Sequence, residues 1–438
     1  MTMLGLLLLL LQPVLVAAAP LAERQVLENG LTLLVRSSRA LPIVNIKVMV
    51  QSGSLWEQEG RAGLANLTAL LLTRGTATRT AAQIDESVDF IGASLSSSAG
   101  RDLSELDLTV LKKDLPKGLE LLADALLHPA FEQGEITRKV QELKAALRKR
   151  QEDPGDVAQE VFDDLVFGSH PYGRLLEGRE ATLTAITRDE IVGFYRDHYA
   201  PERTFVTVVG DVDRSEITGQ IRALLGSWPQ GKATVKRATE PAPLQGKIVV
   251  KKVDRSVTQA NIILGHQGIR RDNPDFYALT VMNYILGGGG FSSRLVERIR
   301  EQKGWAYDVS SQFSPGLERG SFQVVLQTKN ETAGPAIQEV VRELQKIREQ
   351  GVTDQELADA KAYLTGSFPL RLDTNAKLAG LISSVEYYTL GLDYADRYRT
   401  LIDGISKEDI LRVARTYLKP DGYVLVVVAD QAKAALSE

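Results

Sequence analysis

The chain has 438 residues, a formal net charge of −4, and 44% hydrophobic and 25% charged residues. This is the composition of an ordinary globular protein with enough apolar residues for more than one core. There is no long Lys/Arg run, so nothing indicates nucleic-acid binding. The absence of cysteine excludes disulfides, cysteine-ligated zinc and thiol catalysis.

The first residues are typical of a secretory signal. Residues 3–20 read MLGLLLLLLQPVLVAAAP, an apolar core followed by small residues at 17–19 that suit a signal peptidase. A membrane anchor is the alternative, but Gln12 and Pro13 interrupt the run, which falls short of the ~20 residues needed to span a bilayer. We therefore expect a signal peptide at 1–19 and export, which in a bacterium means the periplasm.

Both halves of the chain contain an amphipathic helix, a turn with proline and a β-branched strand. DEIVGFYRDHYAPERTFVTVVGDVD begins at Asp189, and EDILRVARTYLKPDGYVLVVVADQ begins at Glu408. An offset of 219 positions places Pro201 on Pro420 and aligns the two segments without a gap. Two unrelated units could match by chance, but agreement in both order and chemistry favours an internal duplication.

The domain boundaries follow from this repeat. Residues 30–54 and 246–269 both alternate in hydropathy like a hairpin, and a helical stretch follows each. Residues 229–245 are rich in Pro, Lys and Ala and have no apolar period, which is typical of a linker. We expect domains at 20–228 and 246–438. Long helices between bunched strands, as at 114–127 and 132–151, favour an α+β fold.

The histidines do not form a local metal site. The chain has four, at His128, His170, His198 and His266. The closest two lie 28 residues apart, whereas a helical zinc site needs two ligands about one turn apart on one face. No Gly-x-Ser-x-Gly elbow is present, although spacing alone does not exclude a Ser-His-Asp triad. His128 and His170 precede proline, so we expect structural roles for them.

Several segments resemble one enzyme family. ENGLTLLV near the start, HPYGR from His170 and GGGGFSSRLVERIREQKGWAYDVSS from Gly287, together with the repeat, are similar to the M16, or insulinase-type, zinc peptidases. The resemblance covers nearly the whole chain after the signal segment. It implies two homologous domains, each an antiparallel sheet packed with helices, that form half of a clamshell chamber.

The zinc motif of that family is degenerate here. Active members carry His-x-x-Glu-His in a helix that ends in a Lys/Arg-Gly-Thr turn, and a further Glu ligand roughly 75 residues on. The turn in this chain is 74–76, in the segment GLANLTALLLTRGT, and the distal ligand falls one turn from Glu142. The corresponding motif positions are Asn66, Ala69, Leu70 and Ala146.

Those four residues cannot form a catalytic zinc site. Zinc activates water by lowering its pKa from about 15.7 to about 7. Asn66, Ala69 and Leu70 cannot hold the ion between them, and Ala69 cannot act as a base, while the helix can still pack through its leucines. We expect a catalytically inactive N-terminal domain and no cofactor in this chain, with zinc in a partner subunit.

A glycine run, Gly287, Gly288, Gly289 and Gly290, opens the second candidate site. A phosphate loop would need Gly-Lys-Ser/Thr after the run, and a Rossmann loop would need a strand before it. Here Phe-Ser-Ser follows the run and a helix precedes it. The plain interpretation is a helix terminator. The family resemblance implies a loop that faces substrate and partner.

Arg300 and Tyr307 follow that loop. Ser292 or Ser293 is expected to cap a helix that continues to Lys303, and the segment WAYDVSSQF after it alternates as a strand. The resemblance implies that an Arg and a Tyr at this spacing reach over a zinc site and grip the substrate carbonyl. Guanidinium and phenol groups are suitable donors for a developing oxyanion.

A structural role for the pair is the alternative. Arg300 could pair with Glu297 or Glu301 on a solvated face, and Tyr307 could be a half-buried strand aromatic. Arg300 and Tyr307 would then have no part in binding a substrate.

The sequence therefore favours the non-catalytic subunit of an exported, zinc-dependent M16-like endopeptidase. It would bind peptide or unfolded protein by strand addition and supply Arg300 and Tyr307 in trans to a partner with the zinc motif. The alternative is an inert structural or peptide-binding protein. Neither hypothesis requires nucleic acid or a stable membrane anchor.

Overall fold

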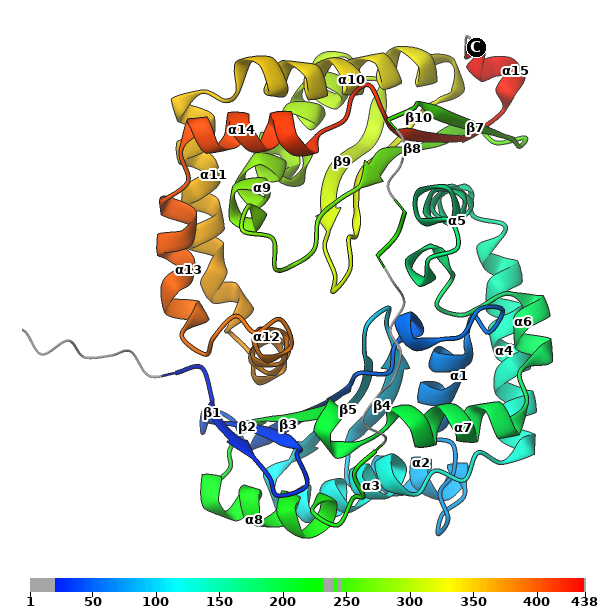
Figure 1. Cartoon of the computed structure of the whole chain (residues 1–438), viewed down its shortest axis with the longest axis vertical. Helices are drawn as coiled ribbons and strands as arrows, with labels where there is room; N and C mark the ends of the chain where they lie inside the picture. The colour runs from blue at the N-terminus through cyan, green and yellow to red at the C-terminus, as the bar shows by residue number, and fades with distance from the viewer. Residues whose placement is uncertain (1–19, 232–239, 243–245, 437–438) are drawn as a thin grey trace, which may run out of the picture.

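The computed structural model describes residues 20–231, 240–242 and 246–436, and the chain folds into two halves that each contain one β-sheet (Figure 1). The expected signal peptide at 1–19 lies outside these residues, as does most of the expected linker. No helix in the described ranges is both long and apolar enough to cross a membrane.

The N-terminal half has a six-stranded sheet in the order β1-β2-β6-β3-β5-β4. Its strands are β1 Glu23–Val26, β2 Thr32–Ser37, β3 Ile43–Val50, β4 Ser94–Ala99, β5 Ser104–Leu111 and β6 Thr204–Gly210. Its α-helices are α1 Leu64–Leu71, α2 Ala81–Phe90, α3 Leu115–Leu127, α4 Gln133–Arg150, α5 Pro154–Phe167, α6 Glu180–Ala185, α7 Arg188–His198 and α8 Arg214–Leu225. Short turns are η1 Ser54–Trp56, η2 Lys112–Asp114, η3 Pro171–Gly173 and η4 Pro201–Arg203.

The C-terminal half has a five-stranded sheet in the order β7-β11-β8-β10-β9. Its strands are β7 Val249–Asp254, β8 Gln259–Gln267, β9 Ala306–Ser314, β10 Ser321–Lys329 and β11 Val424–Ala429. Its α-helices are α9 Phe276–Asn283, α10 Ala333–Gln350, α11 Asp354–Ser367, α12 Asn375–Tyr387, α13 Tyr394–Asp403, α14 Lys407–Tyr417 and α15 Gln431–Ala434. Wide π-helical turns form η5 Tyr284–Gly288 and η7 Val296–Gln302, and 3₁₀ turns form η6 Gly290–Ser292, η8 Asn330–Thr332 and η9 Phe368–Arg371.

The duplicated segment folds the same way in both halves. Helix α7 opens with a capping box at Thr187 and leads into β6, and α14 opens with a capping box at Ser406 and leads into β11. Both strands are buried along their whole length, as expected of apolar β-branched strands covered on both faces. The prediction of an α+β fold with two related domains is confirmed.

One detail of the predicted topology is wrong. The expected hairpin between β2 and β3 does not form, because β6 lies between them, parallel to β2 and antiparallel to β3. In the same way β11 separates β7 from β8. Each sheet is therefore antiparallel except for one parallel pair, a pairing that connects segments too distant in sequence for local patterning to detect.

Each half covers its own sheet on one face only. In the N-terminal half α1, α3, α4, α7 and α8 pack on the outer face around residues such as Ile46 and Val208. In the C-terminal half α9, α10, α11 and α14 pack on the outer face around residues such as Leu264 and Val427. The remaining face of each sheet is covered by the other half.

This cover comes from an exchange of helices between the halves. Helix α5 belongs to the N-terminal half in sequence but packs on β8 and β11 (Figure 1). Its Phe162 belongs to the same buried cluster as Val426 of β11. Helix α12 belongs to the C-terminal half but packs on β3 and β6, where Ser383 donates a buried hydrogen bond of 2.8 Å to Thr207. The expected domain boundaries therefore follow the sheets but not all of the helices.

A polar contact also joins the halves at the β9–β10 turn. The hydroxyl of Tyr172, within the HPYGR segment, donates to the Asp102 carboxylate at 2.5 Å and accepts the N–H of Glu318 at 3.2 Å. Asp102 also accepts the N–H of Leu317 at 3.1 Å. The turn between β9 and β10 is thus fixed to the N-terminal half.

Candidate functional site

Helix α1 carries three of the four degenerate zinc-motif positions. Asn66 and Ala69 are buried and Leu70 is partly buried against the N-terminal core. The carbonyl of Ala69 accepts a hydrogen bond of 2.6 Å from the hydroxyl of Ser97 on the edge strand β4. The helix packs against the sheet, and Asn66, Ala69 and Leu70 give it no set of side chains that could bind zinc.

The fourth position does not restore a site. Ala146 lies on α4, which packs against α1, but it is exposed and has no ligating atom. Glu142, one turn away, is an exposed carboxylate paired with Arg138 and Lys139. No group of three or more His, Asp or Glu side chains that could hold a metal occurs in the described part of the chain. The residues present do not fit zinc.

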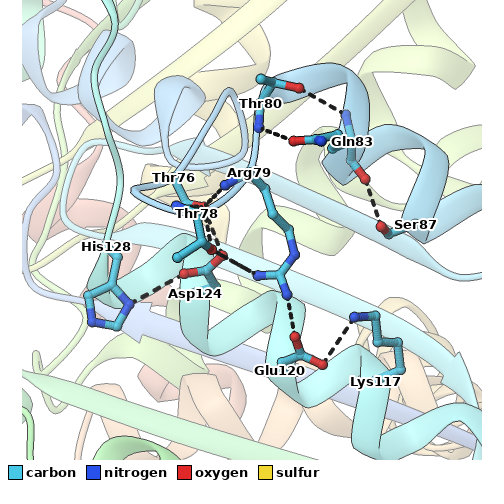
Figure 2. A network of polar contacts seen from close by, with 10 residues as sticks. All are labelled: Thr76, Thr78, Arg79, Thr80, Gln83, Ser87, Lys117, Glu120, Asp124 and His128. Atoms are coloured by element: carbon cyan, nitrogen blue, oxygen red, sulfur yellow. Dashed lines mark hydrogen bonds and ion pairs between the residues drawn. The ribbon is translucent and has the colours of Figure 1, made fainter.

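The turn after α1 is held by a network centred on Asp124 of α3 (Figure 2). The carboxylate accepts hydrogen bonds from Thr76 at 2.8 Å, from Thr78 at 3.0 Å and from the guanidinium of Arg79, and His128 lies 3.4 Å away. Burial alone would raise the pKa of Asp124, but these donors together hold it below its usual value. The Arg-Gly-Thr turn at 74–76, which follows the degenerate zinc motif, therefore has a structural role here.

Glu57 is a buried carboxylate at the other end of α1 that sequence patterns did not single out. One of its oxygens accepts the N–H groups of Gly63 at 3.1 Å and Ala65 at 2.9 Å, so it caps the helix. Burial raises the pKa of Glu57 to about 8, outweighing these hydrogen bonds and the nearby charge of Arg174. The one sequence signal for this role is the position of Glu57, an acidic residue shortly before a predicted helix.

The other histidines are packed as structural residues. His170 is buried and accepts the N–H of Tyr172 at 3.1 Å through Nδ1. His266 is buried between the carbonyl of Gln267 and the N–H of Lys419, and burial lowers its pKa to about 4. The ring of His198 packs 4.3 Å from Phe194, and burial lowers its pKa to about 4 as well.

The second candidate site is built on the glycine run. Helix α9 ends at Asn283, the chain continues as the π turn η5, and the run passes close to its neighbours. A Cβ on Gly287 would lie 2.7 Å from the backbone N of Ser311, and one on Gly288 would lie 2.6 Å from Nδ2 of Asn283. These approaches explain why side chains are missing here. The predicted helix end at this run is confirmed.

A reciprocal pair of hydrogen bonds fastens this loop to the edge strand β9. The amide of Asn283 donates to the carbonyl of Ser311 at 3.0 Å, and the hydroxyl of Ser311 donates back to the amide oxygen at 2.8 Å. The loop and strand enclose a pocket of about 510 Å³. Its lining includes Gly287, Gly288, Gly290, Phe291, Arg300, Asp308, Ser310 and Gln312.

Arg300 lies at this pocket on η7, which differs from the expected helix. Ser293 does stand at the start of the segment, where its carbonyl accepts the N–H of Glu297 at 2.9 Å, but its hydroxyl donates to the carbonyl of Gly290 at 2.7 Å. Residues 296–302 then wind as a π-helix. A bond of 2.8 Å between Glu297 and Gln302, five residues apart, follows from this wider winding. Such turns are rare and often occur at functional sites.

The structural alternative holds in part for Arg300 and fails for Tyr307. Tyr307 is 73% exposed at the start of β9, not half-buried. The guanidinium of Arg300 lies 5.6 Å from the centre of the Tyr307 ring and 4.8 Å from that of Phe291. Arg300 also forms the ion pair with Glu301 that the structural alternative expects, with Nε 3.5 Å from the carboxylate. Two donors thus lie side by side, and one of them, Arg300, lines the pocket together with Phe291, which the sequence did not identify.

Each sheet has an edge strand close to one of the two candidate sites. Strands β4 and β9 end their sheets within the described residues, so their outer N–H and C=O groups have no strand partner there. Such edges accept an extended peptide through main-chain hydrogen bonds. The glycine loop and Arg300 border one edge, and the degenerate helix α1 borders the other.

Comparisons with known proteins agree with this architecture. Residues 32–179 match the family model for insulinase, peptidase family M16, and residues 185–364 match that for the peptidase M16 inactive domain. An uncharacterized zinc protease of Rickettsia bellii is 30% identical over 78% of this chain and 82% of its own. One of Streptomyces coelicolor is 27% identical over 95% and 92%.

Solved structures give the same result. The peptidase M16 inactive domain of Pseudomonas fluorescens superposes with a TM-score of 0.86 at 27% identity, over 93% of this chain and 98% of that one. A protease of Helicobacter pylori has a TM-score of 0.87 and shares the fold at 22% identity, over 94% of this chain and 100% of that one. Matched models, relatives and structures span both halves, and the chain belongs to the M16, or insulinase, family of peptidases.

Proposed function

We propose that this chain is the non-catalytic subunit of a zinc-dependent M16-type endopeptidase. It binds an extended peptide and supplies Arg300 and Tyr307 to the zinc site of a related partner that carries His-x-x-Glu-His. Its match to the M16 inactive domain supports pairing with a catalytic M16 chain. The relatives named zinc proteases imply a metal that Asn66, Ala69 and Leu70 cannot bind.

One observation carries this proposal: the half-buried Arg300 lines the pocket beside the edge strand β9, and its guanidinium lies 5.6 Å from the ring centre of the exposed Tyr307. A guanidinium and a phenol can donate hydrogen bonds to one carbonyl oxygen as it gains negative charge. The strand edge holds the peptide main chain without much sequence preference. A zinc ion held by the partner would supply the activated water, while Arg300 and Tyr307 of this chain would orient and polarise the bond to be cut.

The first test is Arg300→Ala in tagged chain recovered from its native host with its partner. Because a donor to the developing oxyanion is lost, we expect kcat/KM for an unstructured peptide to fall roughly 100-fold while the complex stays assembled. Arg399, which is largely exposed on α13, gives the matched control Arg399→Ala. Unchanged peptidase activity in Arg300→Ala would exclude a role in trans.

The second candidate is an inert structural or peptide-binding protein, which the loss of the metal-binding positions also fits. A chelator separates the two functions. Chelator-sensitive cleavage by the recovered complex, absent from chain expressed alone, supports the subunit role. No cleavage by either preparation, with no second M16 chain recovered, supports the binding protein.

We also propose export with removal of residues 1–19. The apolar run followed by Ala17–Ala19 supports this proposal. Amino-terminal sequencing of the chain from its host should then begin at Pro20. A mature chain that still begins at Met1 would exclude cleavage.

A further inference from the structure

We propose that Phe291 is a positioning residue that holds Arg300 over the pocket in the conformation that meets a peptide carbonyl. The inference rests on the proposed function of Arg300. The guanidinium lies between two aromatic rings, 4.8 Å from the centre of Phe291 and 5.6 Å from that of Tyr307. Tyr307 already has a role in that proposal, whereas Phe291 has none.

Core packing does not explain Phe291. Its side chain is 71% exposed, so the ring buries little apolar surface in the fold. The backbone around it is nevertheless well defined. Gly290 has a positive φ of 58°, and its carbonyl accepts both the N–H and the hydroxyl of Ser293. This closed turn places the ring beside Arg300.

Carboxylates around Arg300 offer a competing position. Glu301 lies 3.5 Å from Nε, Glu297 is on the same π-helix, and Asp308 lines the pocket. A guanidinium paired with one of these would have donors committed to a carboxylate. Contact with an aromatic face holds the cation through its π-surface and leaves the in-plane N–H groups free to donate. Nε of Arg300 already faces Glu301, and contact with Phe291 holds the guanidinium without occupying its remaining N–H groups.

The expected size of the effect follows from the contact. At an exposed site, one cation–π contact changes the balance between two side-chain positions roughly two- to five-fold. Removing the Phe291 ring should lower kcat of the complex by roughly that factor, with KM little changed, because the peptide still binds along β9. A tryptophan should preserve the effect, since its ring binds cations best.

The experiment uses three variants and two readouts. Phe291→Ala removes the ring and Phe291→Trp restores one. Phe90→Ala is the matched control, because Phe90 is 90% exposed on α2 in the other half. The first readout is the Nε–Hε NMR signal of Arg300 in the chain alone, assigned by its loss in Arg300→Lys. The second is cleavage of an unstructured peptide by the complex recovered from the host.

We expect the Arg300 signal to move away from its ring-shifted position in Phe291→Ala, and to stay ring-shifted in Phe291→Trp and Phe90→Ala. An unmoved signal in Phe291→Ala overturns the inference. So does a rise in KM with unchanged kcat, which would make Phe291 a substrate contact. A moved signal together with a complex that cleaves no peptide even as wild type would leave the positioning role intact and defeat the proposed function instead.

Discussion

Buried titratable groups make the stability of this fold depend on pH, and Glu57 is the clearest case. It caps α1 with one carboxylate oxygen, while the other is buried without a hydrogen bond from the described residues. Burial raises the pKa of Glu57 from an ordinary value of 4.5 to about 8. The folded chain therefore holds this proton more tightly than the unfolded chain between those two pH values.

The sign of the pH effect follows directly. Because the folded state binds the extra proton, stability falls as pH rises from 4.5 towards 8. His198 and His266 act in the opposite sense, because their pKa values are lowered to about 4 and their contribution is lost as pH falls below 6.5.

Glu57→Gln isolates the Glu57 contribution. The variant keeps an acceptor for the helix N–H groups and cannot ionise. Between pH 5 and pH 8, the wild type should lose about 3–4 kcal/mol more unfolding free energy than the variant, as measured by urea denaturation. Glu59→Gln, at an exposed position two residues away, should follow the wild type. If the unfolding free energies of wild type and Glu57→Gln changed equally with pH, Glu57 would not have a raised pKa in the folded chain.

At the scale of elements, the glycine loop differs from an ordinary helix end. It lies between two π turns and is tied to β9 by Asn283 and Ser311. Its glycines differ in the space they leave. A Cβ on Gly287 would meet Ser311, whereas a Cβ on Gly290 would meet nothing within 4 Å. The loop is thus tight at its start and open at its end.

Gly287→Ala tests this tight packing. The added methyl should displace β9 and lower the unfolding free energy by about 1–3 kcal/mol, as overpacking usually does. Gly193→Ala is the matched control, since Gly193 lies inside α7 with no atom within 4 Å of the added group, and should stabilise by about 0.5–1 kcal/mol. Urea denaturation measures both. Equal stability of Gly287→Ala and wild type would show that the loop can move aside.

Local elements were predictable where sequence alone determines them. The helices expected at 114–127 and 132–151 are α3 and α4, and the expected strand after Trp305 is β9. The position of β6 between β2 and β3 could not be predicted, because strand order depends on pairing between distant segments. The π-helical winding of η7 could not be predicted either. It follows from packing and side-chain hydrogen bonds, which leave no trace in the hydrophobic periodicity of the sequence.

The same division holds for the candidate site. Counting back from the Arg-Gly-Thr turn located Asn66, Ala69 and Leu70, because the number of residues between the turn and these positions matches the family motif although the side chains differ. Their effect on metal binding follows from side-chain chemistry alone. Phe291 and Asn283 were missed because their roles depend on loop geometry, which brings them to Arg300 and to β9. The functional roles of Arg300 and Tyr307 remain predictions.

At the scale of the whole molecule, the halves depend on each other through α5 and α12. Each helix covers the inner face of the opposite sheet, so neither half is complete alone. Val157, Phe162 and Val166 of α5 pack on β8 and β11. In an isolated N-terminal half these side chains would lose their cover.

A fragment of residues 20–230 should therefore not reach a native state. Exposed apolar faces on α5 and β6 should bind a hydrophobic dye and cause aggregation. Co-expression with a fragment of residues 246–438 should restore solubility, because the missing helix returns. Size-exclusion chromatography and dye fluorescence measure the outcome. A monomeric 20–230 fragment with cooperative unfolding would show that α12 is dispensable.

The exchanged helices also impose an order on how the protein is made. Strands β1 to β6 are complete at residue 210, but the helix that covers their inner face, α12, ends at Tyr387. A ribosome working from the N-terminus must add some 180 further residues before that face can close. Until then Phe205, which stacks 6.2 Å from Tyr387 in the finished protein, has no partner on that side. The first half to be synthesised is thus among the last parts to be completed.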